Sequence, residues 1–148
     1  MAFIVFIIVI TSLPYTSAYF HQSNDWVFSG FLFGVEDGNS YIAKMLLGAQ
    51  GEWLFRSPYT VSEQRGALLY LPYLLLGKIL GPQAEHAHLV LLFHLFRTLS
   101  IAVLCFASYQ FVAHFIHRVV FRRLALVLLT LGSGLGWLLL FFGSTNWL

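Results

Sequence analysis

The stretch HLVLLFHLFRTLSIAVLCFASYQFVAHFI, residues 88–116, decides the fold of this chain. It exceeds the roughly 20 apolar residues that an α-helix needs to cross a bilayer. Arg97 is its one charged residue, and Cys105 is the one cysteine of the whole chain. We therefore expect residues 88–116 to form a membrane-spanning helix.

The composition of the whole chain also indicates a membrane protein. Of the 148 residues, 59% are hydrophobic and 9% are charged, whereas about 25% of the residues in a soluble domain are charged. A single cysteine provides neither a disulfide framework nor a thiolate metal site. The formal net charge of +2 and the scattered basic residues do not indicate a nucleic-acid partner. The lipid bilayer is therefore the first expected partner.

Three more segments are apolar enough to be candidates for membrane-spanning helices. Residues 124–142 form the cleanest of them, and residues 1–20 form another. Residues 67–80 are short and contain Pro72 and Gly77, so they either span with help from their flanks or only dip into the membrane. The sequence predicts an all-α, polytopic integral membrane protein, with residues 1–148 as a single membrane domain of three to four transmembrane helices.

The N-terminal segment has two interpretations. It has a short apolar core followed by Thr16, Ser17 and Ala18, a small-residue stretch that a signal peptidase accepts. However, no Lys or Arg precedes the apolar core, as a signal peptide requires. On these residues alone, a cleaved signal peptide and an uncleaved transmembrane helix are equally compatible with residues 1–20.

Residues 21–66 contain most of the charged residues of the N-terminal half. This segment has three basic and five acidic residues, and a loop this poor in basic residues is expected on the outer face of the membrane. The same rule places the basic turn at residues 117–123 in the cytoplasm. Both expectations hold together only if residues 67–80 do not cross the membrane or if other parts of a larger protein set the topology.

The outer loop is expected to carry a short interfacial helix from Ser40 to Gly51. Ser40 is a suitable N-cap, and apolar residues recur with helical spacing up to Ala49. Such a helix lies on the membrane surface with its apolar side toward the lipid. Lys44 on its polar side is expected to contact lipid headgroups.

Glu36 and Asp37 stand immediately before this expected helix. A carboxylate there either caps the helix, as the turn-forming sequence Asp-Gly-Asn-Ser suggests, or accepts a proton from a substrate hydroxyl at the membrane surface. The residues by themselves favour capping over catalysis.

Several short motifs resemble one class of membrane enzymes. An acidic pair follows the first apolar segment, Tyr41 lies four residues after Asp37, and a surface helix is expected next. The run LLLG ends at Gly77, Arg97 stands in HLFRTLS, and HRVVFRRLA forms the basic turn. Together with GSGLGW at residues 132–137, these features resemble the membrane glycosyltransferases of the GT-C class, above all the protein mannosyltransferases and aminoarabinose transferases. Those enzymes use lipid-phosphate sugar donors.

The resemblance implies a function and roles for individual residues. It implies transfer of a sugar from a polyprenyl-phosphate-linked donor to an acceptor on the outer face of the bacterial plasma membrane, as part of cell-envelope synthesis. Asp37 would be the catalytic base, and Glu36 would orient the acceptor or a water molecule. Tyr41, Arg65 and Arg97 would bind the substrate, the two arginines through its phosphate. Without the resemblance, Arg97 is equally compatible with a snorkelling or carbonyl-paired helix residue.

The resemblance also bears on the ends of the chain. That class keeps its first helix, which favours an uncleaved helix at residues 1–20. Its members are several times longer, so this sequence is expected to be an N-terminal fragment.

A non-enzymatic protein is the alternative. Gly132 and Gly136 form a G-x-x-x-G pattern that supports close helix packing, so a small helical membrane protein assembling through this face is the second hypothesis. Two histidine pairs, His86 with His88 and His114 with His117, have spacings that fit a metal, but they lack the accompanying ligands and are interpreted as interfacial residues. No metal or other cofactor is expected.

Overall fold

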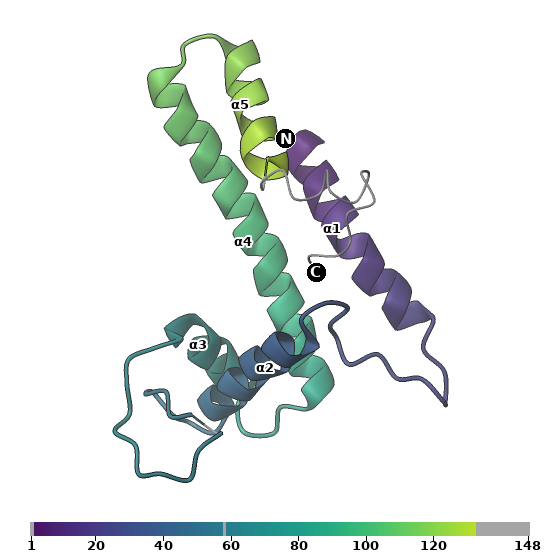
Figure 1. The fold of residues 1–148 in the computed structure, drawn as a ribbon, viewed down its shortest axis with the longest axis vertical. Helices are drawn as coiled ribbons and strands as arrows, with labels where there is room; N and C mark the ends of the chain where they lie inside the picture. The colour runs from purple at the N-terminus through teal and green to yellow at the C-terminus, as the bar shows by residue number, and fades with distance from the viewer. Residues whose placement is uncertain (1, 58, 133–148) are drawn as a thin grey trace, which may run out of the picture. The chain divides into compact units, whose positions relative to one another are not determined.

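The computed structural model describes residues 2–57 and 59–132, and this part of the chain is helical, without strands. Its helices are α1 (Ala2–Phe20), α2 (Val35–Ala49), α3 (Leu71–Leu80), α4 (His86–Phe115) and α5 (Val119–Leu131) (Figure 1). Phe55 and Ala67 form an isolated antiparallel bridge in the loop between α2 and α3. The predicted all-α class is thus confirmed for the described residues.

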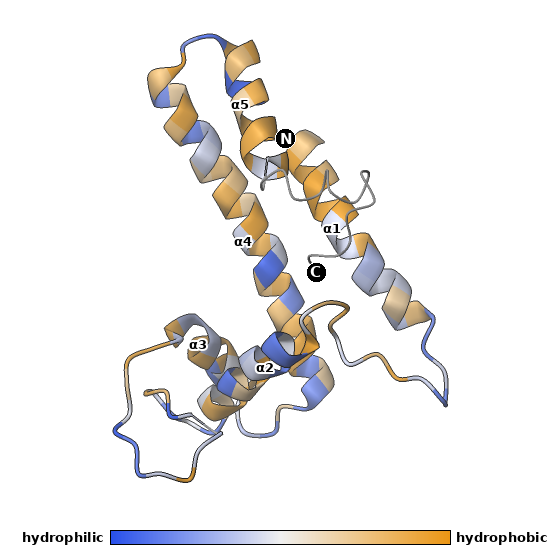
Figure 2. Ribbon diagram, in the orientation of Figure 1, coloured by the Kyte–Doolittle hydropathy of each residue, from blue (hydrophilic) through white to orange (hydrophobic). Residues whose placement is uncertain are grey.

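Within the described residues two helices, α1 and α4, are long and apolar enough to cross a membrane. Figure 2 shows that hydrophobic residues dominate both of them. At ten residues, α3 is a shorter apolar helix. The expected spanning segment 124–142 overlaps α5 up to Leu131, and its remainder from residue 133, which includes Gly136, lies outside the described residues. The full number of three to four spans therefore stays a prediction.

The chain divides into two compact units, Met1–Leu99 and Ser100–Leu148, with the boundary inside α4. The first unit contains α1, α2, α3 and the first half of α4, together with the loops between them. It also contains all the residues that the resemblance singled out for a role in catalysis or binding, so the site is described within this unit.

The helix of the outer loop begins earlier than expected, at Val35 rather than Ser40. Gly34 precedes it in the left-handed conformation, with φ 58° and ψ 45°, which glycine adopts without the steric cost of a Cβ atom. Glu36 and Asp37 therefore lie in the first helical turn, where negative charge interacts favourably with the helix dipole. The prediction that Ser40 is the N-cap was wrong, because Ser40 lies inside the helix and its hydroxyl accepts a hydrogen bond from Lys44.

The apolar side of α2 packs against α3. At Gly48 a Cβ atom would overlap the carbonyl group of Leu74, and at Gly77 it would overlap the carbonyl group of Met45. The two glycines thus allow the backbones of α2 and α3 to touch. Met45 and Leu74 are fully buried at this contact.

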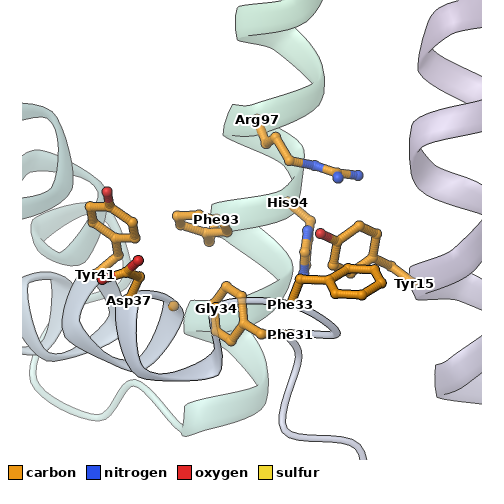
Figure 3. Close-up of a pocket in the computed structure, with 10 residues that line it drawn as sticks. Tyr15, Phe31, Phe33, Gly34, Asp37, Tyr41, Phe93, His94 and Arg97 are labelled. Atoms are coloured by element: carbon orange, nitrogen blue, oxygen red, sulfur yellow. The ribbon is translucent and has the colours of Figure 1, made fainter. Parts of the chain in front are cut away.

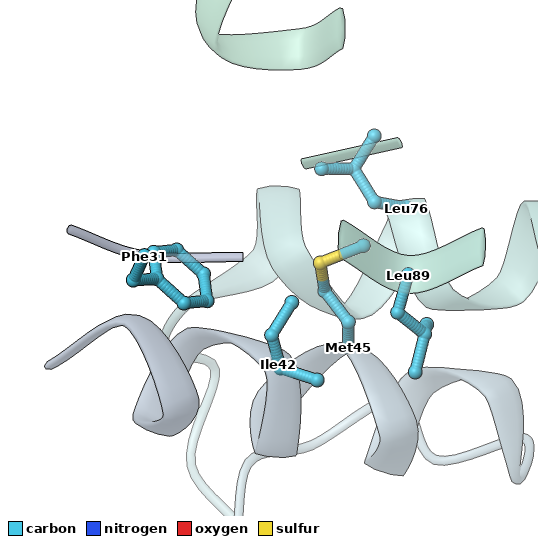
Figure 4. Close-up of a cluster of buried hydrophobic side chains, with 5 residues drawn as sticks. All are labelled: Phe31, Ile42, Met45, Leu76 and Leu89. Carbon is cyan, nitrogen blue, oxygen red and sulfur yellow. The ribbon is translucent and has the colours of Figure 1, made fainter. Parts of the chain in front are cut away.

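A hydrophobic cluster joins α2 and α3 to the start of α4. Figure 4 shows its five buried side chains, which are Phe31, Ile42, Met45, Leu76 and Leu89. The expectation that the apolar side of α2 faces lipid is therefore corrected, because protein side chains occupy it. The loop before α2 takes part as well, since Phe31 is 8% exposed.

Candidate functional site

A pocket of about 270 Å³ lies in the first unit, near the N-terminal turn of α2. Its volume is close to the lower end of the range of about 300 to 1,000 Å³ that small-molecule sites occupy. Figure 3 shows side chains entering it from α1, α2, α4 and the loop before α2. The lining residues are Tyr15, Phe31, Phe33, Gly34, Asp37, Gly38, Tyr41, Phe93, His94 and Arg97.

Asp37 brings a carboxylate to this pocket from the first turn of α2. It is exposed, and its place is set by Gly34, whose carbonyl accepts a hydrogen bond of 2.9 Å from the Gly38 amide. An ionised carboxylate at the N-terminal end of a helix is stabilised by the helix dipole. Asp37 is thus a hydrogen-bond acceptor that a ligand in the pocket can reach.

Tyr41, one turn further along α2, contributes an aromatic wall. Its ring stacks on Tyr73 of α3, with centroids 4.7 Å apart, and on Phe93 of α4, with centroids 5.9 Å apart. The three rings are close to parallel, at interplanar angles of 17° to 27°. Tyr41 and Phe93 both line the pocket, so one of its sides is flat and aromatic.

Arg97 brings a guanidinium group from α4. Its Nη1 donates to the Thr11 carbonyl at 3.2 Å, and its Nη2 donates to the Ser12 hydroxyl at 3.1 Å. The guanidinium carbon also lies 4.4 Å from the centre of the Tyr15 ring, a cation–π geometry. Arg97 is therefore a carbonyl-paired helix residue that binds α4 to α1, and its predicted phosphate contact stays a prediction.

Three of the five predicted site residues come together, and two do not. Asp37, Tyr41 and Arg97 line the same pocket, although Arg97 is far from the other two in the sequence. Glu36 is exposed and is not among the lining residues. Arg65 is exposed in the loop between α2 and α3 and is likewise outside the pocket.

His94 is a pocket residue that the sequence did not predict. Its Nε2 lies 2.8 Å from the Gly30 carbonyl, and its ring centroid lies 4.8 Å from that of Tyr15. The available signal was its spacing from Arg97, because residues three apart share one side of a helix. That signal is weak, since the same spacing is common among residues without any joint function.

Lys44 lies beside the pocket residues, and its side chain is covered by protein groups. Its side chain is 7% exposed, its Nζ donates to the Ser40 hydroxyl at 2.7 Å, and it lies over the rings of Tyr41 and Tyr70. Burial lowers the pKa of the Lys44 ammonium, and the charge of Asp37 partly counteracts this effect. The expected contact with lipid headgroups is therefore wrong, because the ammonium group is enclosed by protein.

The site combines a carboxylate, a guanidinium group, an imidazole and a set of aromatic rings in one pocket. Such a set of groups suits a ligand with hydroxyl groups, a flat apolar face and negative charge. Comparisons with protein-family models, with curated proteins and with solved structures found no match for this chain.

Proposed function

We propose that this chain is the N-terminal part of a GT-C-class membrane glycosyltransferase. It would transfer a sugar from a polyprenyl-phosphate-linked donor to an acceptor at the outer face of the bacterial plasma membrane. The observation that supports the proposal most strongly is the meeting of Asp37, Tyr41 and Arg97 in one pocket. The resemblance had assigned these residues to one active site from motifs that are far apart in the sequence.

In this proposal Asp37 acts as the general base. It accepts the proton of the acceptor hydroxyl as that oxygen forms a bond to the anomeric carbon of the sugar. The bond between the anomeric carbon and the phosphate oxygen breaks, and the phosphate leaves with the electron pair. The proton remains on Asp37 until it passes to solvent.

Arg97 and Tyr41 have supporting roles in the same proposal. A guanidinium group has five N–H donors, and the bonds to Thr11 and Ser12 use two nitrogens without placing a counter-charge beside the group. Its positive charge is therefore available to the negative charge that develops on the leaving phosphate. Tyr41, with Phe93, would face the apolar side of the sugar ring.

The expected topology belongs to the same proposal. We place α1 and α4 across the membrane and the intervening residues at its outer face, with α2 near the interface. The carboxylate of Asp37 then lies at the depth where a lipid-linked donor presents its phosphate and sugar.

One observation favours the non-enzymatic alternative. Both terminal nitrogens of Arg97 bond to α1, as expected for a residue that serves helix assembly in a small membrane protein. This does not account for the exposed carboxylate at the same pocket, and for that reason we prefer the enzymatic proposal.

The decisive experiment is the Asp37→Asn variant, made in the complete reading frame that contains this chain. Asn has nearly the same volume as Asp and keeps a side-chain oxygen, but it cannot take a proton. Loss of a general base typically lowers the rate about 100- to 10,000-fold. Transfer of radiolabelled sugar from polyprenyl-phosphate mannose, and separately from polyprenyl-phosphate aminoarabinose, should fall by this factor while membrane insertion and expression stay unchanged.

Asp25→Asn is the matched control, because it makes the same change at an exposed carboxylate outside the pocket. It should transfer sugar at the wild-type rate. An Asp37→Asn protein that is as active as Asp25→Asn would exclude Asp37 as the base. If the wild-type protein transfers no sugar from either donor, the non-enzymatic alternative is favoured.

A further inference from the structure

The loop before α2, residues 29–34, is held against one side of α4. The Gly30 carbonyl lies 2.8 Å from Nε2 of His94, and the Ser29 carbonyl lies 3.2 Å from Nε2 of His86. Between these two bonds, Val90 occupies the space where a Cβ atom of residue 30 would stand. His86, Val90 and His94 are four residues apart, so they form one line along α4.

The far end of the same loop continues into the turn that carries Asp37. The Phe31 ring packs on Gly38, where no Cβ atom would fit, and it joins the hydrophobic cluster. Gly34 then starts α2 in its left-handed conformation. Few freely rotating residues therefore separate the His94 contact from the Asp37 carboxylate.

The chemistry of the bond between His94 and Gly30 is settled by the acceptor. A carbonyl oxygen only accepts, so Nε2 of His94 carries the hydrogen and donates it. In a neutral ring Nδ1 is then the unprotonated nitrogen, and Nδ1 is buried without a hydrogen-bond partner among the described residues. The bond to Gly30 is thus the one hydrogen bond that this imidazole makes among the described residues.

We propose that His94 is a positioning residue, which sets the place of Asp37 relative to Arg97 by fixing the 29–34 loop on α4. His94 and Arg97 are three residues apart on the same helix, so a loop bound to His94 is also held in register with the guanidinium group. The effect of His94 on catalysis rests on the proposed function, whereas its hydrogen bond to the 29–34 loop does not depend on that proposal.

Three variants of the full chain test this inference. His94→Leu removes the donor, and His94→Gln restores an amide N–H near the position of Nε2. His88→Leu is the matched control, because His88 is an exposed histidine of the first turns of α4 outside the pocket. His94→Gln also distinguishes a lost hydrogen bond from a general folding defect. If the Gln variant behaves like wild type and the Leu variant does not, the N–H donor at position 94 is what the structure needs.

The first measurement is hydrogen–deuterium exchange in detergent at the first turns of α2, residues 35–41. We expect His94→Leu to exchange about two- to tenfold faster there, the factor that corresponds to the net worth of one hydrogen bond. His94→Gln and His88→Leu should exchange at the wild-type rate. If His94→Leu exchanges no faster than His88→Leu, the loop is not held by His94 and the inference is wrong.

The second measurement is sugar transfer, with Asp37→Asn as the reference. We expect His94→Leu to lose turnover, with His94→Gln restoring most of it and the KM for the lipid-linked donor little changed. Faster exchange with wild-type turnover in His94→Leu would overturn the positioning role. An active Asp37→Asn protein would instead overturn the proposed function, and faster exchange in His94→Leu would still support the fixing of the loop.

Discussion

Lys44 shows how a single residue can differ from its sequence pattern. On a helix expected at the membrane surface, a lysine is normally solvated, and only the tertiary structure reveals that Tyr41 and Tyr70 cover this one. Its charge is stabilised by the Ser40 hydroxyl, by two aromatic faces and by the nearby Asp37. Because burial outweighs these contributions, the pKa of Lys44 is lowered in the folded chain.

This lowered pKa predicts a pH dependence of stability. In the unfolded chain Lys44 regains its usual pKa of 10.5, so the unfolded state binds more protons between the lowered pKa and that value, and stability rises with pH in this window. The thermal midpoint of wild type should therefore increase as the pH rises towards 10.5, and less so in Lys44→Met. Lys78→Met, at the other lysine, is the comparison that shows what the loss of a lysine does by itself. Equal slopes in all three proteins would contradict the prediction.

The site residues found from the sequence differ physically from those that were missed. Asp37 was singled out as an acidic residue between apolar segments, and the resemblance then added Tyr41, which lies four residues after it. Arg97 is conspicuous because a charged residue in an apolar helix is rare, but its place in the site came from the resemblance. His94 has no such signal, since its role depends on the carbonyl of Gly30, sixty-four residues away. Arg65 was assigned to the site by the resemblance alone, and it lies outside the pocket, in the loop between α2 and α3.

The contact between α2 and α3 depends on two glycines, one on each helix. An Ala in an exposed part of a helix is more favourable than Gly by about 1 kcal/mol, but here the added methyl group meets the backbone of the facing helix. Overpacking of this kind typically costs about 1 to 3 kcal/mol. Gly48→Ala and Gly77→Ala should therefore lower the thermal midpoint of the purified protein.

Asn39→Ala provides the comparison for the glycine variants. Asn39 is exposed on α2, away from the contact with α3, and Ala has the higher helix propensity, so the midpoint should stay or rise slightly. If the thermal midpoints of Gly48→Ala and Gly77→Ala change as little as that of Asn39→Ala, the backbones of α2 and α3 are farther apart than in the structure.

At the scale of elements, the sequence predicts the long apolar helices better than the helix of the loop. The segment expected at 88–116 is α4 at His86–Phe115, because an apolar run of that length has few alternatives. The start of α2 was missed by five residues, because Asp-Gly-Asn-Ser usually forms turns. Gly38 is tolerated in the first turn of α2 because the Phe31 ring occupies the space of its missing side chain, and a local pattern does not reveal that contact.

For the whole molecule, the length of α3 favours one way to reconcile the two charge-based expectations for residues 21–66 and 117–123. At 1.5 Å per residue its ten residues span about 15 Å, half the thickness of a hydrocarbon core of about 30 Å. Since α3 also packs against α2, both of its ends are expected on the same side of the membrane. If α1 and α4 are the spans, the chain returns to the cytoplasm along α4, and the basic residues Arg118, Arg122 and Arg123 follow on the side that the positive-inside rule favours.

Cysteine labelling in the complete protein tests this topology. In a Cys105→Ser background, cysteines at Gln50 and Ser62 should react with a membrane-impermeant thiol reagent in intact cells, because both positions are exposed in the loop that we place outside. A cysteine at His117, also exposed, should react only after lysis, because the turn after α4 is expected in the cytoplasm. Labelling of His117→Cys in intact cells, together with that of Gln50→Cys, would mean that residues 67–80 cross the membrane after all. The basic turn would then lie outside, against the charge rule, and other parts of a larger protein would have to set the orientation.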